Sequence, residues 1–369
     1  MVGQIADLPH GQLCVTPAPA HFTLPVRDVT LAYGWNLISP PLNPTNADVQ
    51  VVQRGIDGAY AAILGYDGGL QAYYPDRPQE STLQTINALH AYWVRTTVAP
   101  GQPVSDTLEA APFARWQMAG QILPEEQPLP LASGWNLTAY LPRQPLTVTE
   151  ALQGIAGKYG AVLGFERTAL SYYPDLDPSY NTLRWMAPNY GYWISATQAI
   201  TLQYPLTTLT DTLRITDTLA YQDRLAAIRV AEQAAGVQPT YEWMNFYGKP
   251  VLLDGTAIPT GTVVLAVDPQ GVICGATTTW EVGQYGLLAC YRDDPDTDID
   301  EGATPGDVIR LIISTDGIHA AGQVIGTRTW TAPGARQQVP GEAPPEMSHR
   351  TYLPLLLREG SVGVEESKP

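Results

Sequence analysis

Two copies of one sequence unit, offset by 99 or 100 residues, make up most of the first two thirds of this chain. The copies match in ordered blocks and share the motifs GWNL, YYPD and YW. A unit of this length is large enough to form a small folding module of its own. The matching blocks are LAYGWNLISPPL (31–42) with LASGWNLTAYLP (131–142), AAILGYDGGLQAYYPD (61–76) with AVLGFERTALSYYPD (161–175), and STLQTINALHAYWVRTT (81–97) with NTLRWMAPNYGYWISAT (181–197).

Each copy is predicted to fold as a small α+β module. Its order is a strand at GWNL, a short helix, a hairpin that ends at YYP, a turn, and a closing strand at YW. In the second copy, Thr147 and Glu150 have the spacing of a capping box, and Thr45 with Asp48 form a looser version in the first. Proline after the paired tyrosines ends the second hairpin strand, because it has no N–H to donate to a ladder.

The remainder of the chain predicts one longer helix and a β-sandwich. Residues 220–236 (AYQDRLAAIRVAEQAAG) place apolar side chains at helical spacing, and Gly236 suits the C-terminal cap. From residue 241 onward, six short apolar runs separated by turns are typical of a sandwich. The predicted fold is therefore mainly β with short helices: two repeated small α+β modules followed by an Ig-like or transthyretin-like β-sandwich.

The chain is predicted to have six parts. They are an N-terminal extension (1–21), repeat module 1 (22–105), repeat module 2 (106–205), a connector with a helix (206–239), the β-sandwich domain (240–333), and a Pro-rich linker with a C-terminal apolar strand (334–369).

Charge and hydropathy argue against two classes of partner. The chain has 36 acidic against 20 basic residues and a formal net charge of −16, whereas nucleic-acid binding requires a surplus of Lys and Arg. No apolar run is long enough to predict a transmembrane helix, and the first residues lack the pattern of a signal peptide. We therefore expect no nucleic-acid partner and no transmembrane segment, in a chain that is either cytosolic or a mature or trimmed segment.

The repeats and the C-terminal block resemble known surface proteins. The GWNLIS opening, YYP core and YW close resemble repeat modules of large secreted or cell-surface bacterial proteins. The block from WMNFYGKPVLLDG to DVIRLII resembles a companion domain in extracellular proteins of Chloroflexi-type bacteria, and its PTGTVVLAVDPQG and GQYG segments are similar to the carboxypeptidase-regulatory or transthyretin-like sandwich. TYLPLLLR is similar to a terminal motif of such proteins. The resemblance implies an extracellular or cell-surface location.

Two of the three cysteines lie in neighbouring β-like runs. Cys274 is in GVICGATTTWE and Cys290 is in YGLLACYRDD, with a turn-like VGQ between the runs. They could face each other across a hairpin as a disulfide, or remain two buried free thiols. Cys14 is left without a predicted partner.

An acidic run suggests a calcium site. Calcium takes six to eight oxygen ligands, and alternating aspartates in a turn can bring several carboxylates to one ion. The spacing does not match an EF-hand loop, and a merely solvated acidic loop is the alternative. The candidate calcium ligands are Asp293, Asp294, Asp296, Asp298 and Asp300.

The aromatic pairs allow two interpretations. Their flat faces and polar tips could stack on sugars or contact a protein, and the candidate binding residues are Tyr74, Trp93, Tyr173 and Trp193. In a strand, however, adjacent side chains point to opposite faces, so one member of each pair is expected in the core.

No catalytic motif is present in the sequence. The five histidines are scattered, and there is no nucleophile elbow, phosphate-binding loop or dinucleotide-binding motif. The expected function is therefore a non-catalytic extracellular or cell-surface structural or adhesion protein, with itself, other surface proteins or glycans as partners. The alternatives are a carbohydrate-binding accessory protein and, less favoured, an enzyme whose site is assembled in space.

The isolated apolar run near the C-terminus suggests a mechanism of assembly. It follows a Pro-rich linker and could add a strand to a sheet edge of its own chain or of a neighbour. The residues predicted to make this addition are Tyr352, Leu353, Leu355 and Leu357.

Overall fold

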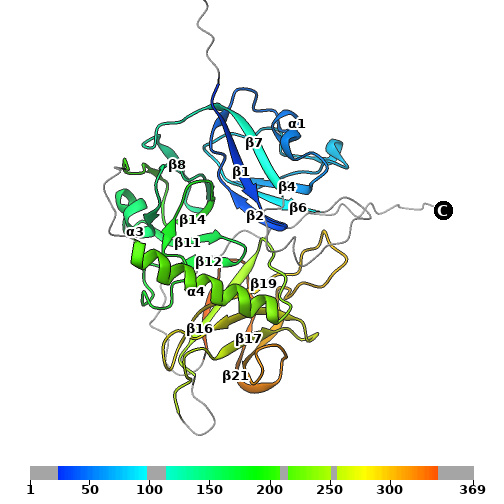
Figure 1. The fold of residues 1–369 in the computed structure, drawn as a ribbon, viewed down its shortest axis with the longest axis vertical. Coiled ribbons are helices and arrows are strands. Elements are labelled where there is room, and N and C mark those ends of the chain that lie inside the picture. The colour runs from blue at the N-terminus through cyan, green and yellow to red at the C-terminus, as the bar shows by residue number, and fades with distance from the viewer. Residues whose placement is uncertain (1–23, 98–113, 208–214, 251–255, 340–369) are drawn as a thin grey trace, which may run out of the picture.

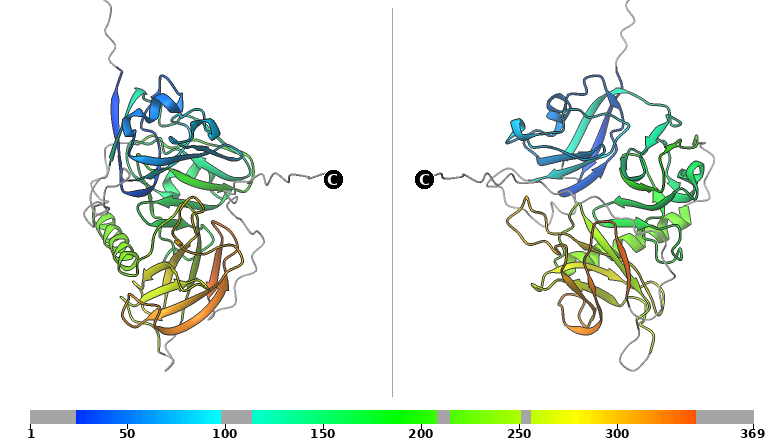
Figure 2. Two further views of the ribbon diagram at one scale, coloured as in Figure 1. Left: turned by 90° about the vertical axis from the view of Figure 1, so that its right-hand side faces the viewer. Right: turned by 180° about the vertical axis from the view of Figure 1, so that it is seen from behind.

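The computed structural model describes residues 24–97, 114–207, 215–250 and 256–339. The fold is mainly β, with few short helices and several antiparallel sheets, as the sequence predicts. Figures 1 and 2 show the two repeat modules packed against each other and against a third, C-terminal part, with the long helix α4 lying along one side.

Module 1 contains seven strands, one short α-helix and two 3₁₀ turns in the described residues. They are β1 (Val26–Leu31), β2 (Gly34–Ile38), β3 (Asn43–Pro44), α1 (Val49–Val52), η1 (Gln53–Ile56), β4 (Tyr60–Tyr66), β5 (Leu70–Tyr73), η2 (Pro78–Glu80), β6 (Tyr92–Thr96) and β7 (Ala114–Gln121).

Module 2 has the same order except that the short strand β13 follows its hairpin in place of η2. Its elements are β8 (Leu129–Leu131), β9 (Gly134–Thr138), β10 (Leu146–Thr147), α3 (Val148–Ala151), η3 (Gln153–Ile155), β11 (Tyr159–Phe165), β12 (Ala169–Tyr172), β13 (Trp185–Met186), β14 (Tyr192–Ala196) and β15 (Ile200–Leu202). Thr147 begins α3 with a full capping box, and Asp48 caps α1 by accepting the Gln50 N–H.

The central sheets of the two modules have the same topology. The strand order is β2-β6-β4-β5 in module 1 and β9-β14-β11-β12 in module 2, and all pairs are antiparallel. Even the irregularity in the ladder recurs, between Tyr60 and Ala62 in the first copy and between Tyr159 and Ala161 in the second. The sequence duplication is therefore a structural duplication.

Strand β7 extends module 1 beyond the predicted boundary at residue 105. It lies in the range assigned to module 2, yet it pairs with β1 and β3 of module 1. The reason is burial: Trp116 and Met118 project from β7 into the core of module 1. The segment between the copies thus closes the first module before the second begins.

Two repeated polar residues shape the modules locally. Asn36 accepts the Ala32 N–H and donates to the Ala32 and Gly34 carbonyls, and Asn136 does the same in the second copy. Gly34 has a positive φ of 84°, which a side chain would disfavour. The GWN motif is therefore a turn-forming device that starts the first strand of each central sheet.

The edge strands β5 and β12 are also closed by repeated residues. The Thr82 hydroxyl accepts the Ala72 N–H of β5, and the Thr182 hydroxyl accepts the Ser171 N–H of β12. The backbone N–H groups of Thr82 and Thr182 donate to the Ala72 and Ser171 carbonyls, respectively. Because the edge groups already have partners, these strands are poor templates for pairing with another chain.

Both faces of each central sheet are buried. One face packs on the module's own core, which contains Tyr92 in module 1 and Tyr192 in module 2. The opposite face, with Trp93 or Trp193, packs into one hydrophobic cluster shared by both modules and the third part, the shared core. The sequence predicts one member of each YW pair in the core, and the structure buries both members, because no face of these sheets is left to solvent at this position.

The two modules meet about an approximate two-fold axis. Ala91 donates its N–H to the Leu137 carbonyl, and Gly191 donates to the Leu37 carbonyl at the equivalent position. The rings of Trp93 and Phe165 lie 5.1 Å apart, and the equivalent rings of Trp193 and Tyr66 are also 5.1 Å apart. The duplication therefore builds a symmetric pair within one chain, as in an isologous dimer.

The third part is formed by two sheets facing each other. Its strands are β16 (Trp243–Gly248), β17 (Val263–Val267), β18 (Ile273–Thr278), β19 (Tyr285–Tyr291), β20 (Val308–Ser314), β21 (Gly322–Thr329) and β22 (Arg336–Val339). The strand orders are β19-β16-β22 and β18-β17-β20-β21, and the core between them includes Phe246, Leu288 and Trp330. Strand β22, which pairs in parallel with β16, extends this part to Val339, past the predicted boundary at 333.

Helix α4 (Ile215–Ala234) matches the predicted connector helix and is followed by Gly236, which has a φ of 73°. Leu225 and Ile228 pack into the core of module 2, whereas Ala231 packs into the shared core. Arg229 donates to the Glu166 carbonyl of module 2. The helix thus joins module 2 to the third part (Figure 1).

The tight approach at the two-fold axis can be tested at Gly191. A Cβ at this position would lie 2.4 Å from the Ala91 Cβ and 2.9 Å from the Ile38 carbonyl oxygen. We expect Gly191→Ala to lower the free energy of unfolding by about 1–3 kcal/mol, because overpacking at this junction forces the modules apart. Adding Ala91→Gly should recover part of the loss in urea titrations. Equal stability of the wild type and Gly191→Ala would contradict the described junction.

Candidate functional site

The predicted disulfide between Cys274 and Cys290 is present, with the Cα atoms 4.7 Å apart. The free-thiol alternative is therefore wrong. The predicted hairpin geometry is also wrong, because β18 and β19 belong to different sheets. The bond joins the two sheets at one of the seams where their edges meet. Cys14 lies outside the described residues.

The four aromatic candidates for a binding surface are core residues. Trp93 and Trp193 are 0% and 2% exposed, and Tyr74 and Tyr173 are also buried. The Tyr173 hydroxyl donates to the Gly334 carbonyl and accepts from the Asn245 amide. These rings hold the modules against the third part, so they offer no open face for a sugar to stack on.

The acidic run forms a loop that contacts module 1. The buried Asp294 accepts a hydrogen bond of 3.1 Å from the Trp35 indole N–H and lies 3.7 Å from the Arg95 guanidinium. Asp296 accepts from the Tyr74 hydroxyl at 3.3 Å. The carboxylates of Asp294 and Asp296 thus form a contact between the third part and module 1.

The other candidate calcium ligands point to local partners or to solvent. Asp293 and Asp300 each accept a nearby backbone N–H, from Glu301 and Gly302, and Asp298 is exposed. In the part of the chain that the structure describes, no group of three or more His, Cys, Asp or Glu side chains is placed to hold a metal ion. Calcium binding at this loop stays a prediction from sequence.

A second polar contact lies under helix α4. Glu232 is buried and accepts a 3.1 Å hydrogen bond from the Tyr291 hydroxyl, which in turn accepts the Ala169 N–H of module 2. Burial raises the pKa of the Glu232 carboxyl to about 8, although hydrogen bonds from Thr168 and Tyr291 and the charge of Arg229 act in the opposite direction. At neutral pH this carboxyl is therefore largely protonated.

A buried ion pair lies beside this contact. Arg292 and Glu242 form it within the third part, and the Thr240 hydroxyl donates to the Arg292 carbonyl. Removing one member of such a pair leaves an uncompensated charge in the interior, so these residues fix the local packing. The Glu232 carboxyl and the Arg292–Glu242 ion pair each have partners within the chain, which indicates a structural role for both contacts.

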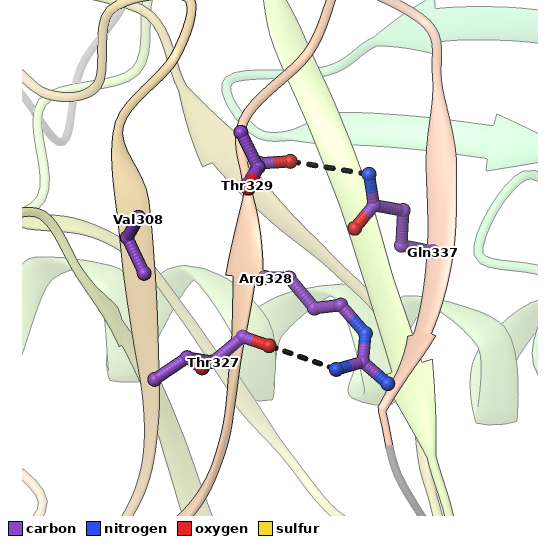
Figure 3. Close-up of a pocket in the computed structure, with 5 residues that line it drawn as sticks. All are labelled: Val308, Thr327, Arg328, Thr329 and Gln337. Carbon is purple, nitrogen blue, oxygen red and sulfur yellow. Dashed lines mark hydrogen bonds between the residues drawn. The ribbon is translucent and has the colours of Figure 1, made fainter.

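The second seam of the third part is open to solvent. A shallow pocket lies between the ends of β20, β21 and β22, and Figure 3 shows its lining side chains. The carbonyl oxygens of Thr327 and Thr329 point from β21 toward β22 and accept hydrogen bonds from the side chains of Arg328 and Gln337. Arg328 Nε also donates to the Gln338 carbonyl of β22. Side chains thus bridge two strands that belong to different sheets.

Sequence reasoning missed this seam and the Glu232 contact. Arg328 and Gln337 stand in polar stretches with no motif, and Glu232 looks like an ordinary surface residue of an amphipathic helix. The predicted strand-addition residues, Tyr352 to Leu357, lie outside the described residues.

Comparisons with protein-family models, with curated proteins and with solved structures found no match to this chain. Within the described residues, no helix is both long and apolar enough to cross a membrane.

The role of the acidic loop can be tested with two aspartates. Asp294→Ala leaves the buried Trp35 N–H without an acceptor, so we expect a loss of about 1–3 kcal/mol in the free energy of unfolding. Asp298→Ala, at an exposed position of the same loop, is the matched control and should change it by less than about 0.5 kcal/mol. Chemical denaturation with and without a chelator measures both. Equal effects of the two substitutions, dependent on calcium, would favour an ion-binding loop instead.

The buried carboxyl predicts a specific dependence on pH. Because the folded-state pKa of Glu232 is raised from 4.5 to about 8, its contribution to stability is complete below about pH 4.5 and is lost as the pH rises toward 8. Glu232→Gln stays neutral. Its free energy of unfolding should therefore rise relative to that of the wild type across this pH window, by at most about 5 kcal/mol above pH 8. Glu126→Gln, at an exposed position, should follow the wild-type profile. A constant difference between Glu232→Gln and the wild type from pH 5 to 9 would contradict the assignment.

Proposed function

We propose that this chain is a non-catalytic structural module of an extracellular or cell-surface protein, and that it assembles with further copies through strand addition by its C-terminal segment. The observation that carries the proposal is the contrast between sheet edges. The module edges β5 and β12 are closed by the residues that follow them, whereas the edge of β21 in the third part is bridged to β22 through side chains.

The way the parts are joined supports a structural role. One hydrophobic cluster runs through both modules and the third part, with Trp93 and Trp243 in ring contact. Polar contacts at Asp294 and Glu232 add to this junction. Parts with a common core move together, which suits a rigid spacer within a larger assembly.

The residues shared by the two copies also support it. The matched tryptophans fill the shared core, the matched asparagines form turns, and the matched threonines close edges. What the duplication preserves is thus a framework. The disulfide is in keeping with the proposed location, because such bonds form and persist in oxidising compartments.

Deleting residues from Met347 to the C-terminus tests the proposal. We expect the full chain to form multimers and the shortened chain to be monomeric, because the donor strand is gone. Light scattering after size-exclusion chromatography measures the mass, and thermal unfolding measures stability.

Two point-substituted chains make the deletion specific. Leu353→Ser, Leu355→Ser and Leu357→Ser together should reproduce the effect of the deletion, since a strand that adds to an edge needs its apolar side chains. Val362→Ser with Val364→Ser, in the polar end of the chain, is the matched control and should leave assembly intact. If neither mass nor melting temperature responds to the deletion, strand addition is wrong.

A further inference from the structure

The outer edge of β21 has the geometry of a strand acceptor. The Thr327 and Thr329 carbonyls point away from β20 and toward β22 (Figure 3). In an extended strand the N–H and C=O of one residue point to the same side, so the N–H groups of both threonines lie on this edge as well. Backbone donors and acceptors at alternate residues are what an added strand pairs with.

The bridge across the seam can be exchanged for a strand. Arg328 Nε reaches the Gln338 carbonyl at 2.8 Å, and the Gln337 amide reaches the Thr329 carbonyl at 3.1 Å. Both side chains are long and flexible, and water can replace their bonds if they swing outward. A backbone ladder along β21 would satisfy the same carbonyls with several bonds in place of single side-chain contacts.

Apolar surface borders this edge. Val308 lines the pocket at the seam, Val324 lies on β21, and each is 51% exposed. An added strand with apolar side chains at alternate positions would cover such residues. The seam thus offers both the hydrogen bonds and the apolar contact that a donor strand requires.

The geometry points to residues 351–358 (TYLPLLLR) of a second copy of this chain as the occupant of the seam between β21 and β22. This inference rests on the proposed function and names its acceptor. The eight residues of the donor are enough to cover residues 326–329, the part of β21 that follows the irregularity in its ladder with β20. Leu353, Leu355 and Leu357 share one face and one hydrogen-bonding edge, and Pro354 falls on the opposite edge. The edge that meets β21 is therefore complete.

The linker favours a neighbouring copy over the same chain. Pro340, Pro344 and Pro345 follow directly after Val339, the last residue of β22, which forms one wall of the seam. Pro-rich linkers extend by about 3.1 Å per residue and act as semi-rigid spacers. The Pro-rich composition of residues 340–350 therefore favours an acceptor on another copy over the acceptor of the same chain.

Complementation between two full-length variants tests the inference. Thr327→Pro removes the N–H of the acceptor edge but keeps the donor segment intact. The triple variant Leu353→Ser, Leu355→Ser, Leu357→Ser keeps the acceptor but has no competent donor. We expect each variant alone to be monomeric and their mixture to form a 1:1 dimer of twice the monomer mass, because one donor and one acceptor allow a single junction.

Controls separate blocked assembly from misfolding. Thr327→Val keeps the N–H and should assemble like the wild type. Thr327→Asp with Thr329→Asp blocks the acceptor edge by charge at two exposed positions but keeps the donor segment. Alone it should be monomeric, and mixed with the donor-deficient chain it should form the same 1:1 dimer as Thr327→Pro. Circular dichroism and melting temperature confirm that each variant is folded.

The outcomes distinguish this inference from the proposed function. If the deletion from Met347 abolishes multimers but Thr327→Pro and the double-Asp variant still assemble, the donor binds elsewhere and the seam is not the acceptor. A mixture that stays monomeric while the wild type assembles overturns the exchange between copies. If the wild type itself never assembles, the proposed function fails, and this inference fails with it.

Discussion

The packing of two tryptophan-bearing sheet faces against each other is the interaction on which the rest of the structure depends. Each central sheet uses one face for its own module and the other for the shared core. Trp93 and Trp193 contact Phe165 and Tyr66 in the partner module at the same separation. Burying a tryptophan face removes a large apolar area from water, so separating the modules would expose a large hydrophobic surface on each.

The third part and helix α4 complete this core and fix its orientation. Trp243 and Tyr291 enter the shared core from β16 and β19. Around them, polar groups form specific pairs: Asp294 with Trp35 of module 1, and Tyr291 with Glu232 of α4. Apolar packing alone tolerates sliding, whereas a buried polar group loses its partner when the parts shift. The hydrogen bonds therefore define one arrangement of three parts that hydrophobic burial holds together.

Two kinds of bonding occur at the sheet edges of this chain. The modules close theirs with hydroxyl and amide side chains from the loops that follow, as at Thr82 and Thr182. The third part joins its sheets with a disulfide at the β18–β19 seam and with Arg328 and Gln337 at the other. The covalent seam cannot open without reduction, while the polar one can exchange partners.

The sequence by itself determined the local structure. The capping box at Thr147, the glycine cap after α4 and the mainly β fold follow from short-range patterns, and the duplication follows from matching blocks 99 or 100 residues apart; the structure has all of them. The pairing of Cys274 with Cys290 was one of two open alternatives, because sequence spacing does not report how far apart two strands lie in space.

The tertiary structure alone decided how these elements meet. A YW pair alternates in a strand, but only the presence of a second module shows that both of its faces are buried. An aspartate-rich loop is typical of calcium sites, yet Asp294 lies against an indole and a guanidinium from more than 190 residues away. For the same reason, the sequence does not predict the place of β7 in module 1, the buried carboxyl of Glu232 or the seam beside β21. Residues distant in the sequence determine how deeply a side chain is buried, which charges surround it and which sheet edges stay open. A local sequence pattern does not identify those residues.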